Sequence, residues 1–139
     1  LEFFKKKLVT PCITRWNSYY DSLKCLLEFD LDTINGAFAS LDMRKWRFLE
    51  SDFTFLKEYC QVLEPIATAL DMCQGETECF YGLGIPIIQN VIKELNDIPI
   101  QSLKYAGPLV TTAIEGVKRR FGRFDLLVSH VLLISIFHS

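Results

Sequence analysis

Apolar residues recur at intervals of three and four positions over most of the chain, which is the spacing of one face of an α-helix. This pattern predicts helices over residues 17–27, 32–41, 51–74, 83–96 and 102–121. No repeat with a period of 20–50 residues is visible in the sequence. We therefore expect a single all-α domain over residues 1–139, built from five to six helices in an irregular bundle.

The third of these patterns is the strongest. Ser51 is a candidate N-cap and Gly75 a candidate stop. Pro65 falls inside the pattern, and because the apolar period continues beyond it we expect the proline to kink the helix without ending it. The face expected to turn toward the core consists of Phe55, Leu56, Tyr59, Leu63, Ile66, Ala67 and Leu70.

Local signals mark the other segments. Asn17 or Ser18 is expected to cap the first helix. Gly36 weakens the second helix, and Pro86 suits the first turn of the fourth. The last segment, residues 126–137, is apolar and rich in β-branched residues, so its sequence leaves helix and strand both open.

Composition and charge narrow the function classes. Half of the residues are hydrophobic and 23% are charged, which supports a folded core. The net charge is −2, so contact with nucleic acid needs a local basic patch. Apolar residues precede the basic ones at the start, the reverse of a secretory signal. The apolar run at 126–137 is shorter than the roughly 20 residues of a membrane span.

The cysteine pattern favours packing over metal binding. The five cysteines are Cys12, Cys25, Cys60, Cys73 and Cys79. Their number is odd, no C-x-x-C pair occurs, and both histidines lie far from them in sequence. A zinc site needs paired ligands at short spacing. We therefore expect reduced thiols in the core of an intracellular protein, and no metal.

Motifs for catalysis do not occur in the printed sequence. Gly82 and Gly84 form G-x-G without the third glycine or the lysine of a phosphate-binding loop. G-x-S-x-G is missing, and His130 and His138 lie in the apolar tail. The acidic residues near the second helix have a spacing that favours a solvated face over a metal site: Asp21, Glu28, Asp30 and Asp32. We predict no enzyme activity and no cofactor for this chain alone.

One short segment differs from the helical background: Thr14-Arg15-Trp16-Asn17-Ser18. Packing alone makes Trp16 the apolar anchor of the first helix and leaves Arg15 in solvent. A nucleic-acid role uses the same side chains, since an indole stacks on an unpaired base and a guanidinium holds a phosphate. Stacking of this kind contributes about 1–3 kcal/mol per base. The residues by themselves leave both interpretations open.

This segment resembles the Arg-Trp motif of the hAT transposases and of host proteins derived from them, which often carry a BED zinc finger. Three further segments follow in the family's order. They are residues 49–70 with a Leu-Glu-Pro run, the apolar residues 85–95, and the basic-aromatic residues 118–124. The resemblance covers the chain from Thr10 to about Phe124. The chain departs from the family after Phe124, where an Asp-Pro-Arg-Phe-Lys-like phrase is missing.

The resemblance implies a parent with an RNase H-like core, in which two Asp and one Glu bind divalent metal. It places this chain on the helical insertion of that core, at about residues 14–124. The catalytic acids then lie beyond both ends, so no catalytic residue is assigned here, and both ends are expected to be cuts through a longer protein. Terminal segments are then candidates for strands of the parent's sheet. The dimerisation region of the family is missing as well.

Site residues follow from the same resemblance. Arg15 and Trp16 match positions that in the family contact a flipped base and a DNA hairpin. The implied partner is hairpin or transposon-end DNA, in the nucleus. The expected phosphate contacts are Lys118, Arg119, Arg120 and Arg123.

Two other functions remain open. A domesticated descendant serving as a protein-interaction module is favoured by the near-neutral charge. It is favoured also by aromatic residues outside the clearest helical faces, Phe3, Phe4 and Trp46. A stand-alone metal-dependent nuclease is opposed by the missing acidic triad.

Overall fold

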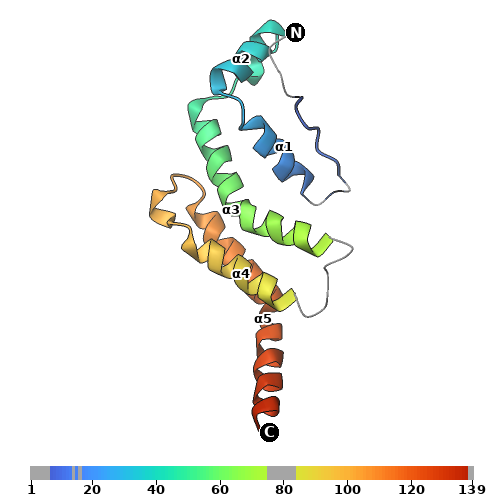
Figure 1. Cartoon of the computed structure of the whole chain (residues 1–139). Helices are drawn as coiled ribbons and strands as arrows, with labels where there is room; N and C mark the ends of the chain where they lie inside the picture. The colour runs from blue at the N-terminus through green and yellow to red at the C-terminus, as the bar shows by residue number, and fades with distance from the viewer. Residues whose placement is uncertain (1–6, 14, 16, 75–83, 138–139) are drawn as a thin grey trace.

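The computed structural model describes residues 7–13, 15, 17–74 and 84–137, and for residues 123–137 it describes the backbone alone. This part of the chain is all-α and contains no strand (Figure 1). The predicted all-α class is therefore confirmed. The α-helices are α1 (Ser18–Leu26), α2 (Leu31–Ser40), α3 (Glu50–Gln74), α4 (Gly84–Asp97) and α5 (Gly107–Phe137). Two short 3₁₀ helices, η1 (Arg44–Trp46) and η3 (Ile100–Ser102), lie in the connections before α3 and α5.

The N-terminal caps agree with the prediction only in part. Asn17 occupies the N-cap position of α1, but its side chain makes no capping hydrogen bond. In α2 the Asp30 carboxylate caps the helix by accepting from the Thr33 amide at 2.7 Å. The predicted cap of α3 at Ser51 is wrong. α3 begins at Glu50, and the Asp52 carboxylate reaches back to the Leu49 amide at 2.8 Å.

α3 is the longest helix whose side chains are described throughout, and α1, α4 and α5 all contact it. Pro65 lies inside it, as predicted, and the helix continues to Gln74. A proline removes one backbone donor from the ladder. The axis of α3 changes direction about midway along its length (Figure 1). The predicted stop at Gly75 falls on residues 75–83, which lie outside the described residues.

The second half of the chain differs more from the prediction. α4 begins at Gly84, with Pro86 in its first turn, close to the predicted bounds. α5 begins at Gly107, five positions later than predicted, because residues 100–102 form η3 instead. The segment 126–137, for which helix and strand were both open, is helical and is therefore not one of the candidate strands. No proline interrupts the sequence after Pro108, and the helical ladder therefore continues to Phe137.

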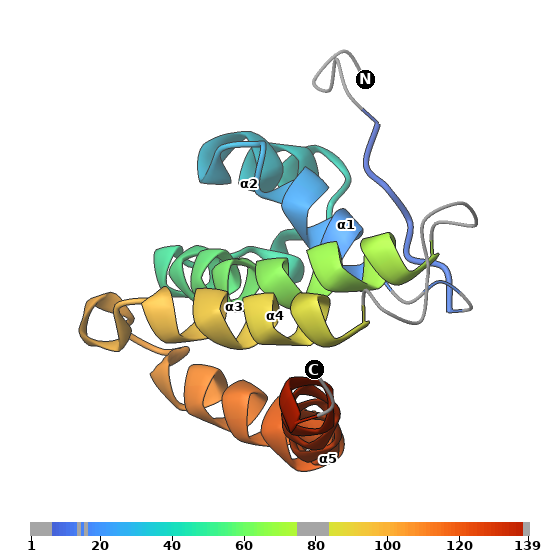
Figure 2. The same cartoon turned by 60° about the horizontal axis from the view of Figure 1, so that its bottom comes forward.

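The core lies between α3, α4 and α5. Its fully buried residues are Val62, Val91, Leu95, Ala106 and Val110. A smaller aromatic cluster joins α2 to the start of α3. In it the ring centroids of Phe38 and Phe48 lie 6.0 Å apart, and those of Phe48 and Phe53 lie 5.7 Å apart. α1 lies beside α3, whereas α5 extends past the ends of the other helices (Figures 1 and 2).

The predicted core face of α3 needs correction. Of its members Ala67 is fully buried, five are half-buried, and Phe55 is exposed. The reason is that α1 contacts α3 from one side while α4 and α5 contact it from another, so buried positions are spread around the helix. The buried residues of α3 are Phe53, Glu58, Cys60, Val62, Pro65 and Ala67.

The prediction that cysteines pack in the core holds for two of the four that the structure describes. Cys25 and Cys60 are buried, and burial raises the pKa of the Cys60 thiol. Cys12 and Cys73 are exposed, because one lies in the irregular segment before α1 and the other in the last turn of α3. No disulfide joins these four residues. Cys79 lies outside the described residues.

Among the described residues, no helix combines the length and the apolar character needed to cross a membrane.

Candidate nucleic-acid interface

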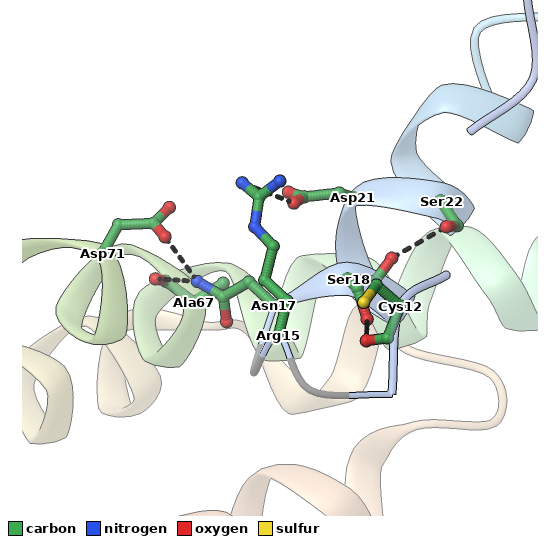
Figure 3. A network of polar contacts seen from close by, with 8 residues as sticks. All are labelled: Cys12, Arg15, Asn17, Ser18, Asp21, Ser22, Ala67 and Asp71. Carbon is green, nitrogen blue, oxygen red and sulfur yellow. Dashed lines mark hydrogen bonds and ion pairs between the residues drawn. The ribbon is translucent and has the colours of Figure 1, made fainter. Parts of the chain in front are cut away.

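The Arg-Trp segment is tied to α3 by one buried amide. The Asn17 side chain is 3% exposed. Its Nδ2 donates to the backbone carbonyl of Ala67 and to Oδ1 of Asp71, both at 2.8 Å (Figure 3). A buried amide that donates both of its hydrogens in this way fixes the position of the chain next to it.

The chain before α1 also folds back on itself. The Arg15 amide donates to the carbonyl of Cys12 at 3.1 Å, and the Ser18 amide donates to the carbonyl of Arg15 at 3.2 Å. The hydroxyl of Ser18 donates to the same Cys12 carbonyl at 2.5 Å. The Ser22 hydroxyl in turn donates to the Ser18 carbonyl (Figure 3). These bonds fold the chain into a compact turn that includes Arg15.

Arg15 reaches solvent from that turn. Its side chain is 65% exposed, and its guanidinium forms an ion pair with the Asp21 carboxylate at 3.3 Å. An exposed ion pair of this kind contributes about 0–1 kcal/mol, so a phosphate can replace the carboxylate at little cost. Trp16, the other residue of the predicted pair, lies outside the described residues.

The predicted phosphate contacts on α5 are solvent-accessible as far as the structure describes them. Lys118, Arg119 and Arg120 are all exposed. Within the described part of the chain none of them forms an ion pair. Because successive residues of a helix are rotated by about 100°, these three side chains are spread over roughly 200° of the helix surface. They form a band around α5 instead of one flat patch. The side chain of Arg123 lies outside the described residues.

Two of the acidic residues near α2 have structural roles. Asp21 pairs with Arg15, and both oxygens of Asp30 bond Thr33, at 2.7 Å to its amide and 2.7 Å to its hydroxyl. The hydroxyl and amide of Thr33 lower the pKa of Asp30. No group of three or more His, Cys, Asp or Glu among the described residues is arranged to hold a metal ion.

Among the described residues Glu58 is the charged residue that is buried, and the sequence pattern did not single it out. It is 8% exposed. Its carboxylate accepts hydrogen bonds from the amides of Lys104, Tyr105 and Ala106, at 2.7, 2.7 and 2.9 Å. Burial raises the pKa of Glu58, but the three amides and the charge of Lys104 outweigh burial, and the pKa is lowered.

The role of Glu58 is to hold the chain that enters α5. Its three donors come directly before the helix, where amides have no helical partner. One sequence signal could have found it: Glu58 precedes Val62 by four positions and Pro65 by seven, so the carboxylate shares a helical face with core residues. Because its acceptor positions are used by the backbone, we regard Glu58 as structural.

The two apolar cavities between the helices are smaller than a typical small-molecule site. The one lined by apolar side chains and Cys73, between α3, α4 and α5, has a volume of about 150 Å³. A second, between α3 and α4, has about 190 Å³. Both lie below the roughly 300–1,000 Å³ of typical ligand pockets. A larger polar pocket of about 490 Å³ lies between α2 and η1.

Comparisons with known proteins leave the family of this chain open. No family model, no curated protein and no solved structure matches it.

Proposed function

We propose that this chain is a helical DNA-contacting domain, similar to the insertion domain of a hAT transposase, that acts in the nucleus as part of a larger protein. It has no strand-cleaving activity by itself, because the acids that the resemblance assigns to catalysis lie outside it. The observation that carries the proposal is the presentation of Arg15. The guanidinium reaches solvent from a turn that Asn17 clamps to α3.

The geometry supports a contact with the DNA backbone in three ways. First, the turn is held by side-chain bonds, so Arg15 needs little ordering when it binds. Second, the Asp21 pair is exposed and exchangeable. Third, the cations Lys118, Arg119 and Arg120 give a chain of net charge −2 the local basic surface that it needs.

The test is fluorescence anisotropy of a labelled DNA hairpin titrated with the chain over a range of salt concentrations. Lys118, Arg119 and Arg120 are replaced together by Gln, and Trp16→Ala is measured beside them. Loss of these cations is expected to reduce the slope of log K against log salt by up to about 2.7, the value for three phosphate contacts. Trp16→Ala is expected to weaken binding to the hairpin by about tenfold, from the loss of base stacking.

The matched control is Lys93→Gln, which removes an exposed cation from α4. Its expected effect on the salt slope is under about 1, since a single distant charge is removed. Hairpin binding that is the same in all these variants, for a chain with unchanged helical content, would contradict the proposal.

A second function, a protein-interaction module without DNA activity, is favoured by one specific observation. An aromatic surface lies on α3 and the segment before α5, where the Phe55 ring stacks on Tyr59 at 5.9 Å and meets Tyr105 at 6.5 Å. Phe55 and Tyr105 are both exposed. Aromatic side chains are enriched in protein interfaces. Capture of one defined protein that is lost in Phe55→Ser, with no DNA retained at low salt, would favour this function over the first.

A further inference from the structure

We propose that the segment Arg44–Arg47, together with the polar pocket between it and α2, is a binding site for single-stranded nucleic acid. The segment reads Arg-Lys-Trp-Arg and includes η1. It precedes the first turn of α3, whereas Asn17 binds α3 at Ala67, roughly 25 Å of helix further along. Figure 1 shows α2 at the end of α3 where that helix begins. The proposal therefore concerns a separate surface and does not rest on the function proposed above.

The chain is brought into this position by the turn that ends α2. Asp42 has a φ of 56°, in the left-handed region that aspartate tolerates better than most residues. The Met43 amide donates to the Phe38 carbonyl at 2.8 Å, and the Asp42 amide donates to the Ala39 carbonyl at 3.2 Å. This pair of bonds is a Schellman motif, which closes the helix and reverses the chain directly before Arg44.

The other end of the segment is held by Asn35 of α2. Its Nδ2 donates to the Phe48 carbonyl and its Oδ1 accepts from the Phe48 amide, both at 2.9 Å. The Phe48 ring packs between Phe38 and Phe53. Hydrogen bonds to the backbone therefore fix the basic segment at both ends, and the segment is ordered before any ligand binds. A site that is already ordered loses less entropy on binding.

The charged groups around the pocket suit a phosphate. Arg44 and Arg47 both line it, in a volume of about 490 Å³. Both are exposed, and neither forms an ion pair with another described residue. Planar guanidinium groups match the oxygens of a phosphate in a bidentate arrangement. Asp32 also lines the pocket and opposes an anion, so the positive charge of the two arginines is only partly offset.

Trp46 supplies the second half of the recognition. Trp46 is 59% exposed, whereas Phe48, two positions later, packs in the aromatic cluster with Phe38 and Phe53. Nζ of Lys45 lies 5.5 Å from the centre of the Trp46 ring. Trp46 stands between Arg44 and Arg47 in the sequence, and an exposed indole flanked by two arginines suits the alternation of base and phosphate along an unpaired strand. A free phosphate or an acidic peptide offers no base for the indole to stack on.

The first experiment follows binding through the fluorescence of Trp46 itself. The chain has two tryptophans, so in a Trp16→Phe background all indole fluorescence comes from Trp46. Titration with a short oligothymidine is expected to quench it, because stacking brings a base against the ring. Arg44→Gln with Arg47→Gln is expected to weaken this binding by at least about tenfold and to reduce the salt slope by about 1.4.

Further variants test charge and stacking separately. Asp32→Asn removes the opposing charge and is expected to tighten binding several-fold, which a merely structural role would not produce. With a labelled oligothymidine, Trp46→Ala is expected to lose at least about fivefold in affinity, and Trp46→Phe to recover part of it. Lys93→Gln is the matched control, and circular dichroism confirms that each variant keeps its helices.

The proposal is overturned if a folded chain shows no quenching, or if the paired arginine substitution leaves binding unchanged. It is overturned also if polyglutamate competes as well as oligothymidine, since the ligand is then any polyanion. Inorganic phosphate alone is expected to compete weakly. The outcome is independent of the α5 cations: the Lys118, Arg119 and Arg120 substitution is expected to leave oligothymidine quenching intact even if hairpin binding is lost.

Discussion

α3 contacts α4 and α5 on one side and α1 on another, and the two sets of contacts are of different kinds. The α3–α4–α5 bundle is closed by apolar side chains, with Val62, Leu95 and Val110 fully buried between the helices. α1 buries only Ser18 and Cys25 completely. It is attached to α3 by polar bonds, through Asn17 in the interior and Lys24 at the surface. Apolar burial supports the fold as a whole, whereas the polar bonds position one turn.

This difference implies two levels of stability in one chain. Segments with few buried apolar contacts open at lower free energy than the core. We expect the α1 layer to open locally while the bundle remains folded. Four substitutions test this comparison.

The largest effect is expected from Leu95→Ala. Leu95 is fully buried in the α3–α4–α5 core, and replacing such a leucine with alanine costs about 2–5 kcal/mol. The free energy of unfolding, measured by urea titration followed by circular dichroism, should fall by this amount in one cooperative transition. Ile92→Ala, on the same helix and half-buried, is the control and should cost less. Equal losses would mean that the core is centred elsewhere.

Glu58→Gln is expected to destabilise the same bundle by the next largest amount at neutral pH. The glutamine offers one oxygen to three amides and points an N–H₂ group at the others. The pKa of Glu58 is lowered in the folded state. The stabilisation is therefore fully present above the unfolded pKa and is lost as pH falls through the lower, folded pKa.

Urea titrations of the unsubstituted chain and of Glu58→Gln, at a series of pH values, measure how the stabilisation by Glu58 depends on pH. The difference between the free energies of unfolding should be constant near neutral pH and should shrink once pH falls below the ordinary glutamate value of 4.5. Comparison with Glu58→Gln isolates this group from Asp30, whose pKa is also lowered. A difference that does not change with pH would show that Glu58 is not held as a carboxylate.

Asn17→Ala removes the buried bonds between the Arg15 turn and α3 and should cost about 1–2 kcal/mol. The cost is expected to fall on α1 and not on the bundle. Hydrogen exchange should therefore show faster exchange in α1, with the amides of α4 still protected. Loss of protection in both helices would mean that α1 and the bundle unfold as one unit.

The smallest effect is expected from Lys24→Met. Lys24 pairs with Glu64 at 3.2 Å, with both side chains more than half exposed. The Tyr20 hydroxyl and Glu64 raise the pKa of Lys24. An exposed pair of this kind contributes about 0–1 kcal/mol, and salt screens it. Thermal unfolding at low salt should show a slight loss that disappears at high salt. A larger loss would mean that polar contacts hold α1 more firmly than their exposure suggests.

The sequence by itself determined the helical class and the position of the most periodic helices. Apolar spacing located α4 within a residue, and it carried α3 through Pro65, because local periodicity reflects the geometry of the single helix. Apolar spacing placed the start of α5 wrongly. The backbone before α5 is held by the Glu58 carboxylate of α3, which accepts from the Lys104 amide 46 positions later in the chain. Apolar spacing also gave the wrong buried face for α3, because α1 covers one side of that helix while α4 and α5 cover another.

Only the tertiary structure decided how the candidate sites are built. Asn17 or Ser18 was expected to cap α1. Asn17 holds the N-cap position, but its side-chain amide donates to Ala67 and Asp71 of α3 instead of capping the helix. The sequence shows that Arg15 and the cations of α5 are basic, but it does not show that Arg15 pairs with the Asp21 carboxylate. The pocket beside Arg44 and Arg47 exists because Asn35 clamps Phe48 across a turn. Such contacts join residues far apart in the chain, and no local pattern encodes them.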